Sequence, residues 1–512
     1  MLRPKLCARW GFPLNDLDNI KPNRAVATSI GPVGLFFANP HPSTTDVGTI
    51  VAGSIKRLAY KHPDPDVNTL NALDIWLEKN IQRFVCKTKR STKMSIHEWL
   101  SLTNYSAKRK KELYNVFLNL MSRPDRDVNI EIVKLFIKME TYPEYKHARG
   151  ISSRSDEYKV LFGPWAKMIE EVLYDPNSSE LSPSFIKHVP VSDRPQYVKE
   201  RVYSPDAGVY YSTDYSAFES QFVENLMTMI EHRIFRYICS DVEGYPELDR
   251  LLKAQVDNNQ LRNRKVYFDV KATRMSGEMT TSAGNGISNL IFFHFVSEVL
   301  CGCTDVVGVV EGDDGLFRIG SSFRLPDSTD FAKPGLTIKI ETHEVLETAS
   351  FCGIIFDTKS NVNITDPISV IMDLPWLNPR YIKSRDSKKY GILKSKLMSN
   401  ICQYPGCPII YPVCVKWFRE LRKYDHRVRH YKDWYSQEKE KSYGKIDLSL
   451  DVYESSRHLM SLKFGISEQR QKEIEQKLLK ISVYNVNYNE SMFAEFVHPD
   501  IVTGKQIGRA HV

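Results

Sequence analysis

The stretch Glu311-Gly312-Asp313-Asp314-Gly315-Leu316-Phe317 follows one apolar run and precedes an alternating apolar run. This pattern predicts a β-hairpin with two adjacent carboxylates at its tip. Two neighbouring carboxylates are poor core residues but good ligands for divalent cations that prefer oxygen donors. Because Gly-Asp pairs are also common in surface β-turns, this stretch alone leaves both a metal site and a plain turn open.

A second acidic segment lies upstream of this hairpin. Residues 208–213 form a short β-rich run that ends on Asp214-Tyr215-Ser216-Ala217-Phe218-Glu219, before a helical pattern begins. If the two strands are neighbours in one sheet, Asp214 lies close to the Gly-Asp-Asp hairpin. Such carboxylates, with substrate phosphates, can hold two Mg²⁺ ions about 3.5–4 Å apart for phosphoryl transfer. A helix N-cap is the alternative role for Asp214.

A third segment falls between the two acidic ones. Residues 276–285 read Ser-Gly-Glu-Met-Thr-Thr-Ser-Ala-Gly-Asn and lead into a helical pattern. Thr281, Asn285 and Asn289 recur every four residues and therefore share one helix face. That face carries hydrogen-bonding groups, as a surface that contacts ribose would. A Gly/Ser loop that caps an amphipathic helix is the plainer alternative, but it does not explain why the segment lies between the two acidic ones.

Together, the three segments resemble motifs A, B and C of the RNA-dependent RNA polymerases of positive-strand RNA viruses. Asp-x₄-acid, Ser-Gly-x₃-Thr-x₃-Asn and Gly-Asp-Asp occur here in the expected order. Residues 335–339 also resemble motif D, residues 350–353 resemble motif E, and residues 105–109 with Tyr114 resemble motif G. The resemblance runs from residue 105 to residue 353.

The segment upstream of Asp214 is rich in cations and resembles motif F of tombusvirus-like replicases. It carries Lys-x-Glu at 138–140, Arg-x-Ile-x-x-Arg at 149–154 and Gly-x₃-Lys at 163–167. The resemblance implies that four cations line the nucleotide tunnel and hold the triphosphate, since Arg favours bidentate phosphate contacts. These cations are Lys138, Lys146, Arg149 and Arg154. A solvated basic loop is the alternative.

The resemblance implies further roles in catalysis. Asp214, Asp313 and Asp314 would be catalytic carboxylates that ligate Mg²⁺, or Mn²⁺, which accepts the same oxygen ligands. The ribose 2′-hydroxyl, which distinguishes RNA precursors from DNA precursors, would be recognised by Glu219, Ser276, Gly277, Thr281 and Asn285. Lys339 would protonate the departing pyrophosphate as general acid. Alternation with neighbouring apolar residues also fits Lys339 to the polar face of a strand.

One position departs from the family pattern, because the family usually has Asp where this chain has Glu219. The extra methylene moves the carboxylate by the length of one C–C bond. This change could be absorbed locally or could shift the recognition of the sugar.

Contacts with template and product RNA are implied at motif G, at motif E and further downstream. The residues concerned are Lys108, Arg109, Phe351, Cys352, Lys388 and Lys389. The last two belong to a basic cluster in residues 380–396 that could hold the backbone of the product duplex. A solvated helix face explains this cluster equally well.

The resemblance implies an α+β, right-hand polymerase with an RRM-like antiparallel palm sheet packed on helices and a mainly helical thumb. Fingers are expected in residues 1–200 and 220–273, the palm in 201–219 and 274–372, the thumb in 373–500, and a tail in 501–512. Residues 468–480 alternate acid and base as an exposed helix does. Residues 506–512 resemble a translated sequencing-library adapter, so we assign them no function.

The composition agrees with this interpretation. At 512 residues, 42% of them hydrophobic, the chain can bury a large core and exceeds one ordinary domain. Its net charge of +8 suits a protein that holds acidic polymers around a centre of carboxylates. The nine cysteines lack zinc-site spacing, and we expect reduced thiols. The apolar stretches are too short to span a bilayer.

The expected function is template-directed RNA synthesis from NTPs, which replicates a viral positive-strand genome. The resemblance implies the host cytoplasm, in membrane-associated complexes with other viral replicase proteins. Two alternatives keep part of the pattern. A reverse transcriptase shares the paired aspartates, but it usually carries a bulky residue where an RNA polymerase reads the 2′-hydroxyl. Asn285 and the Ser276-Gly277 loop speak against it. A non-catalytic RNA-binding replication subunit explains the basic surfaces but not the three aspartates together.

Overall fold

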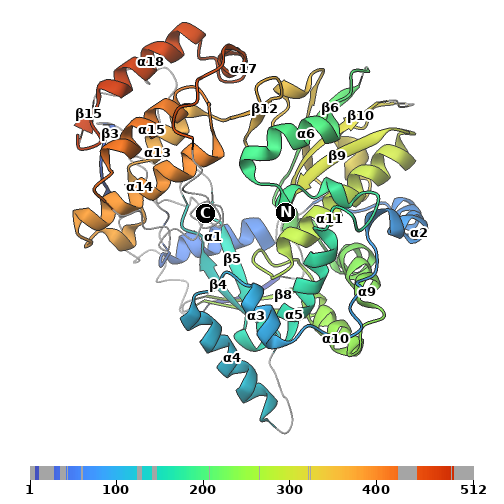
Figure 1. The fold of residues 1–512 in the computed structure, drawn as a ribbon. Helices are drawn as coiled ribbons and strands as arrows, with labels where there is room; N and C mark the ends of the chain where they lie inside the picture. The colour runs from blue at the N-terminus through green and yellow to red at the C-terminus, as the bar shows by residue number, and fades with distance from the viewer. Residues whose placement is uncertain are drawn as a thin grey trace.

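The computed structural model describes residues 6–10, 28–34, 42, 44–58, 62–123, 130–140, 147–206, 208–263, 266–320, 322, 324–424, 447–485 and 487–488. Lys146 and residues 506–512 lie outside these described residues. The fold is mixed α+β, as expected from the sequence. Figure 1 shows one sheet with helices at the upper right, a second sheet with helices below it, and a helical region at the upper left.

The four-stranded antiparallel sheet has the strand order β11-β6-β10-β9. Its strands are β6 (Val209–Tyr215), β9 (Val306–Glu311), β10 (Asp314–Ile319) and β11 (Ile338–His343). β9 and β10 form the hairpin expected around Gly-Asp-Asp, with Asp314 paired to Glu311. β6 pairs with β10 on one side and β11 on the other. The two acidic segments are therefore neighbours in one sheet, as the sequence predicted.

Helix α11 (Thr281–Phe295) packs against β9 and β10. It is the helix expected after the Ser-Gly segment, and all its residues from Ala283 onward are buried. Phe293 of α11 stacks on Phe317 of β10, with a ring-centroid distance of 3.7 Å and an interplanar angle of 4°. This aromatic contact adds to the apolar area that joins the helix to the hairpin.

The five-stranded sheet has the strand order β1-β8-β7-β4-β5. It consists of β1 (Leu6–Trp10), β4 (Ile132–Ile137), β5 (Gly150–Arg154), β7 (Asn258–Arg262) and β8 (Val266–Lys271). Buried and exposed side chains alternate along β4, as expected for a sheet with one face in the core. Helix α1 (Val47–Leu58) packs on this sheet, and its Val47 and Ile50 share a hydrophobic cluster with Leu135 and Phe268.

A group of helices surrounds α11 and fills the central hydrophobic cluster. It comprises α2 (Val67–Phe84), α3 (Ile96–Leu102), α4 (Ala107–Met121), α5 (Asp156–Leu173), α9 (Arg233–Cys239) and α10 (Tyr245–Val256). The first four begin at side-chain N-caps that accept a hydrogen bond from the backbone N–H three residues on, namely Asp66, Ser95, Ser106 and Ser155. Helix α6 (Arg194–Val202) lies against β9.

The described residues from 367 onward are mainly helical, and the sequence pattern predicted helices from Asp373 onward. Its helices are α13 (Pro367–Asp373), α14 (Asp386–Gln403), α15 (Ile410–Glu420), α17 (Glu454–Phe464) and α18 (Glu468–Lys480). These helices enclose a second hydrophobic cluster, which contains the buried Cys402, Cys407 and Cys414. Two short strands, β12 (Ile355–Asp357) and β13 (Val362–Ile364), precede them.

Two N-terminal strands pair with this helical region. β2 (Thr28–Ser29) pairs with β14 (Trp376–Leu377), and β3 (Val33–Gly34) runs parallel to β15 (Asn487–Tyr488). Between them Gly31 has a φ of +88°, and a Cβ there would lie 2.9 Å from Leu393 Cδ2 and 3.1 Å from the Val483 carbonyl oxygen. Glycine is therefore required where the N-terminal segment crosses α14.

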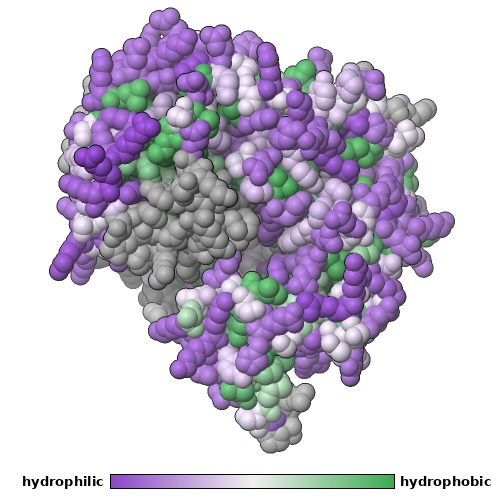
Figure 2. Space-filling model, viewed as in Figure 1, coloured by the Kyte–Doolittle hydropathy of each residue, from purple (hydrophilic) through white to green (hydrophobic). Residues whose placement is uncertain are grey.

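The surface seen in Figure 2 is largely hydrophilic, with scattered apolar patches. One patch lies toward the lower end, where α4 exposes Leu118 and Met121. No helix among the described residues is both long enough and apolar enough to cross a membrane.

Candidate active site

Three aspartates meet at one edge of the four-stranded sheet. Asp214 is the penultimate residue of β6, while Asp313 and Asp314 lie where the β9–β10 hairpin turns. Gly315 of β10 pairs with Thr213 of β6, so the next residues toward this edge are Asp314 and Asp214. The sheet register therefore brings together carboxylates that are far apart in the sequence.

Burial and like charge both act on the carboxylates at this edge. Burial, followed by the charges of Asp313 and Asp214, raises the pKa of Asp314 to about 7. The pKa of Asp313 is also raised, first by burial and then by the charges of Glu219 and Asp214, while Arg149 lowers it. The protein thus holds several carboxylates close enough to disfavour one another's ionisation.

A divalent cation fits the chemistry of this cluster, because oxygen ligands suit Mg²⁺ and the positive charge would offset the carboxylate repulsion. In the described part of the chain, no group of three or more His, Cys, Asp and Glu side chains is arranged so that it could hold a metal ion. The oxygen donors thus suit such an ion in their chemistry, while their present arrangement does not form a ligand shell.

Asn289 of α11 fixes the hairpin that carries two of the aspartates. Its side-chain Nδ2 donates to the carbonyl oxygens of Asp313 and Asp314, both at 3.1 Å, and lies 3.5 Å from that of Gly312. The side chain is fully buried. Asn289 shares the helix face predicted to contact ribose, but the structure shows it bound to the hairpin backbone. Its spacing from Asn285 was the only sequence signal for it.

The loop before α11 packs against β5. Ser152 donates its backbone N–H to the Ser276 carbonyl oxygen at 2.6 Å. Gly277 has a φ of +107°, and a Cβ there would lie 2.8 Å from both Ile151 Cγ2 and the Ser152 carbonyl oxygen. Only glycine therefore allows this close approach. The hydroxyl of Thr281 accepts from the Gly277 N–H at 3.2 Å, so Thr281 stabilises the loop itself.

Asn285 is buried and has a fixed amide. Its Oδ1 accepts a 2.6 Å hydrogen bond from Arg274 Nη1. Arg274 also binds Glu231 and Ser288 and stacks on the ring of Phe222, with its Cζ 3.5 Å from the ring centroid. This bond fixes the orientation of the Asn285 amide, whose N–H₂ group is a donor. Arg274 was not identified from the sequence, where it appears as an isolated cation.

Glu219 lies in the short helix α7 (Phe218–Gln221), directly after β6, and is 8% exposed. Its Oε2 lies 3.2 Å from Arg57 Nη1 of α1. Both residues line a narrow cavity with Ser54, Ser152, Arg274 and Ser276. Glu219 contributes to the raised pKa of Asp313, so it faces the aspartates as well.

The comparison with protein families accords with this geometry. A family model described as viral RNA dependent RNA polymerase matches residues 54–485. The chain belongs to this viral polymerase family.

Curated relatives are found among viruses of fish. The chain is 26% identical to the RNA-directed RNA polymerase of Atlantic halibut nervous necrosis virus and 27% identical to that of striped jack nervous necrosis virus, each over 196 residues. Each match covers 36% of this chain and 18% of the relative. The chain therefore spans less than a fifth of the length of these polymerases.

The cations of the motif F segment occupy different environments in this polymerase-family chain. Arg149 is close enough to Asp313 to lower its pKa, and it also lies 3.5 Å from Glu140. Lys138 pairs with Glu140 at 2.8 Å. Arg154 is 2% exposed, and its Nε donates to Glu278 at 2.6 Å. Arg154 therefore joins β5 to the motif B loop, while Lys138 and Arg149 are partly exposed.

Lys339 and the motif E residues border the aspartates. Lys339 of β11 pairs with Asp214 across the strands, and its Nζ lies 2.6 Å from Glu341 Oε1, which raises the pKa of Lys339. Phe351 is buried in the cluster beneath the sheet. Cys352 Sγ lies 3.9 Å from Glu311 Oε2, and a hydrogen bond from Cys352 lowers the pKa of Asp314.

The other cations predicted to contact RNA are far from the aspartates in the sequence. Lys108 is exposed in the first turn of α4, while Arg109 forms two hydrogen bonds with Asp156 at the start of α5. Lys388 and Lys389 lie in the first turns of α14, with Lys388 over the Tyr381 ring and Lys389 3.9 Å from Asp386.

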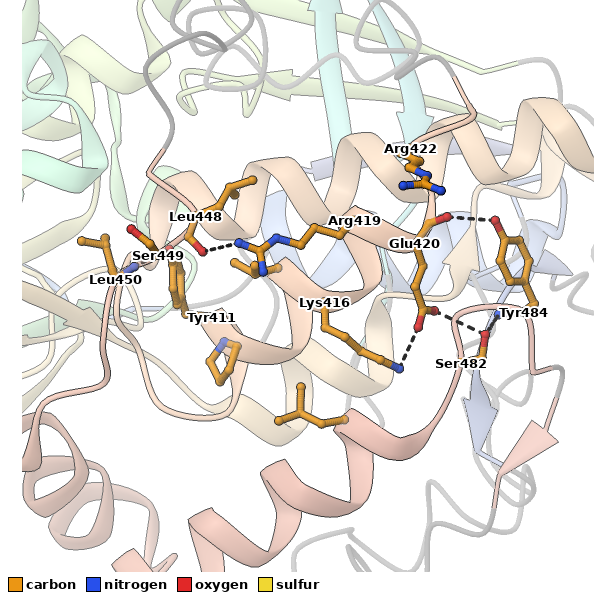
Figure 3. A pocket seen from close by; sticks show the side chains of 13 residues that line it. Tyr411, Lys416, Arg419, Glu420, Arg422, Leu448, Ser449, Leu450, Ser482 and Tyr484 are labelled. Atoms are coloured by element: carbon orange, nitrogen blue, oxygen red, sulfur yellow. Dashed lines mark hydrogen bonds and ion pairs between the residues drawn. The ribbon is translucent and has the colours of Figure 1, made fainter.

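A cavity of about 810 Å³ lies beside α15, between residues 448–450 and the C-terminal end of α18 (Figure 3). Its lining includes Tyr411, Lys416, Arg419 and Tyr484. Lys416 pairs with Glu420 at 3.0 Å, and Arg419 donates to the Leu448 carbonyl oxygen at 3.0 Å. These two cations are thus engaged within the protein, and we assign the cavity no function.

Proposed function

We propose that this chain catalyses template-directed RNA synthesis. In this reaction the 3′-oxygen of the growing strand attacks the α-phosphorus of an NTP, and the bond to pyrophosphate breaks. The observation that carries the proposal is the convergence of Asp214 with Asp313 and Asp314 at one sheet edge, in a chain of the viral polymerase family. Such a transfer depends mainly on positioning and charge neutralisation.

The carboxylate cluster would hold the divalent ions. Asp214 and Asp313 would be the main ligands, and Asp314 would add charge or a weaker contact. When bound, two Mg²⁺ or Mn²⁺ ions would supply the positive charge that activates the attacking hydroxyl and stabilises the leaving oxygen. The raised pKa values of Asp313 and Asp314 support this assignment.

The other side chains would orient the nucleotide. Glu219 and Asn285, with the Ser276-Gly277 loop, would contact the ribose, and Arg149 and Lys138 would hold the triphosphate. Lys339 Nζ would donate a proton to the departing pyrophosphate. The pairing of Lys339 with Glu341 keeps this amine protonated.

A right-hand layout is the arrangement that these segments favour. Strands of the five-stranded sheet come from residues 1–200 and 220–273, the expected fingers. The four-stranded sheet comes from 201–219 and 274–372, the expected palm. The helices α14, α15, α17 and α18 come from 373–500, the expected thumb. The strand pairs of β2 and β3 would then tie the fingers segment to the thumb.

The biological setting follows from the resemblance to positive-strand virus replicases. The enzyme would copy such a genome in the host cytoplasm, in membrane-associated complexes with other viral replicase proteins. An assay of RNA synthesis on isolated membranes, with and without the partner proteins, would test this setting.

The decisive experiment measures incorporation of labelled UTP by the purified chain on a short RNA template with Mg²⁺. Asp313→Asn should abolish extension, because it removes a charge while keeping the side-chain volume. Asp206→Asn is the matched control, since Asp206 is exposed near the opposite end of β6. RNA binding without extension by the wild type would favour a non-catalytic subunit, and a preference for dTTP would favour a reverse transcriptase.

A further inference from the structure

We propose that Arg57 of α1 is a specificity-determining residue that positions Glu219 for recognition of the ribose 2′-hydroxyl. The inference rests on the proposed polymerase function. Helix α1 would thus influence, through Glu219, the choice between ribonucleotides and deoxyribonucleotides.

The contact itself is well defined. Arg57 Nη1 donates to Glu219 Oε2 at 3.2 Å, and the side chains are only 20% and 10% exposed. Partial burial makes an ion pair less screened by water and salt than a surface pair. Among the described residues, the second oxygen Oε1 has no hydrogen-bond partner. Arg57 therefore fixes one carboxylate oxygen and leaves the other as an acceptor.

A second contact from the same segment holds the same short helix. His62 lies 2.7 Å from Ser220 Oγ through Nε2 and 3.1 Å from Thr337 Oγ1 through Nδ1. His62 and Ser220 are both buried. Two consecutive residues of α7, Glu219 and Ser220, are thus each bound by the chain around the end of α1. This arrangement aligns α7 independently of the aspartate edge.

Glu219 lies in the wall of the narrow cavity described above. Its walls include Arg57, Glu219, Arg274 and Ser276. Arg274 Nη1 donates to Oδ1 of Asn285 and so orients this amide, whose N–H₂ group can donate, and Glu219 Oε1 can only accept when ionised. A hydroxyl that donates to Glu219 and accepts from Asn285 would satisfy both groups. A deoxyribose would leave the Glu219 carboxylate and the Asn285 amide without this partner, and a buried polar group that lacks a hydrogen bond costs binding free energy.

The length of the acidic side chain is part of this arrangement. Glu219 reaches Arg57 at 3.2 Å. An aspartate at this position would be shorter by one C–C bond, about 1.5 Å, and would lose the direct contact unless the backbone moved. The pair therefore accounts for glutamate at this position in physical terms.

The test compares kcat/KM for CTP and dCTP in single-nucleotide extension of an RNA primer. Arg57→Gln should reduce the preference for CTP about tenfold, through a higher KM for CTP with little change for dCTP. Arg57→Lys should restore part of the preference. Lys56→Gln is the matched control, because it removes a charge from the exposed neighbouring position of the same helix.

A double-mutant cycle covers the case in which the single variant is poorly folded. Glu219→Asp should cause a similar loss, and the double variant should lose no more than either single one, because both changes remove the same contact. Unchanged discrimination in Arg57→Gln, with only a lower melting temperature, would show a purely structural pair. A wild-type protein that extends no primer would overturn the proposed function instead, and the inference with it.

Discussion

At the scale of single residues, the carboxylate edge is the feature that makes the folded protein respond to pH. The pKa of Asp314 is about 7, above the usual value of 3.8, because the group is buried beside Asp313 and Asp214. A carboxyl with a raised pKa in the folded state stabilises the fold fully below pH 3.8. This stabilisation is lost as the pH rises through about 7.

A bound divalent cation should offset the loss of stability that ionisation of Asp314 causes. Because protons and metal ions compete for the same oxygens, the apparent Kd for Mg²⁺ should rise up to about tenfold for each pH unit below 7. Calorimetric titration of the purified chain at pH 6 and pH 8 would measure this dependence. In Asp314→Asn, the dependence should weaken, and the metal-free protein should melt at a higher temperature than wild type at pH 8. An affinity that is equal at both pH values would contradict the assignment.

The sequence identified some of these residues better than others. Asp214, Asp313 and Asp314 could be predicted because each lies at or near the end of a segment with a strand-like sequence pattern. Arg57 and Arg154 could not be placed, because their partners Glu219 and Glu278 lie 162 and 124 residues away. Local periodicity carries no information about such pairs, so a buried cation has the same sequence signature as a solvated one.

At the scale of elements, α11 connects the Ser276-Gly277 loop to the aspartate hairpin. Its first turn carries Thr281 at the loop, its second carries Asn285, and its third carries Asn289 at the hairpin. A shift of the helix would therefore move both parts of the site together. This coupling makes Asn289 a positioning residue, since it acts through the backbone of Asp313 and Asp314.

Removing the Asn289 amide should lower the turnover rate more than the nucleotide affinity. In Asn289→Ala, the hairpin carbonyls lose their donor, so we expect kcat to fall about tenfold or more with little change in KM. The matched control is Asn363→Ala, because Asn363 is equally buried and donates to the Val191 and Gln403 carbonyl oxygens. Both variants should lose stability, by about 1–3 kcal/mol. An equal fall in kcat in both would show that Asn289 acts only through stability.

Elements with strong local patterns could be predicted from the sequence. The acid-base alternation of residues 468–480 corresponds to α18, and the Gly-Asp-Asp stretch corresponds to the β9–β10 hairpin. The pairing of β2 with β14 could not be predicted, because a strand of two residues is too short to show an alternation of apolar and polar side chains. Their position is decided by tertiary contacts, such as the fit of Gly31 against Val483 and Leu393.

At the scale of the whole molecule, residues 28–34 join the start of the described chain to its C-terminal helices. This junction is held by short strand pairs and by the close packing of Gly31. The same N-terminal portion of the chain continues into α1, which reaches Glu219. One segment therefore contacts both the C-terminal helices and the candidate site.

Loosening this junction should impair long syntheses selectively. Gly31→Ala combines a left-handed backbone with a steric conflict, so we expect a lower melting temperature and shorter products on long templates. Addition of a single nucleotide should be little affected. Gly465→Ala is the control, because Gly465 has a φ of +70° but open space around its Cβ position. Equal product lengths for the two variants would show that the junction does not influence processivity.

The pairing of early strands with late ones also sets an order of events during synthesis on the ribosome. β1, β2 and β3 are translated first, but their partners are β8, β14 and β15. Each early strand must therefore wait for a segment made much later, and contacts of such long sequence separation form slowly. We expect the nascent chain to remain without its N-terminal closure until translation has passed residue 488. Dependence on chaperones should consequently be greatest for ribosome-bound chains that stop before β15.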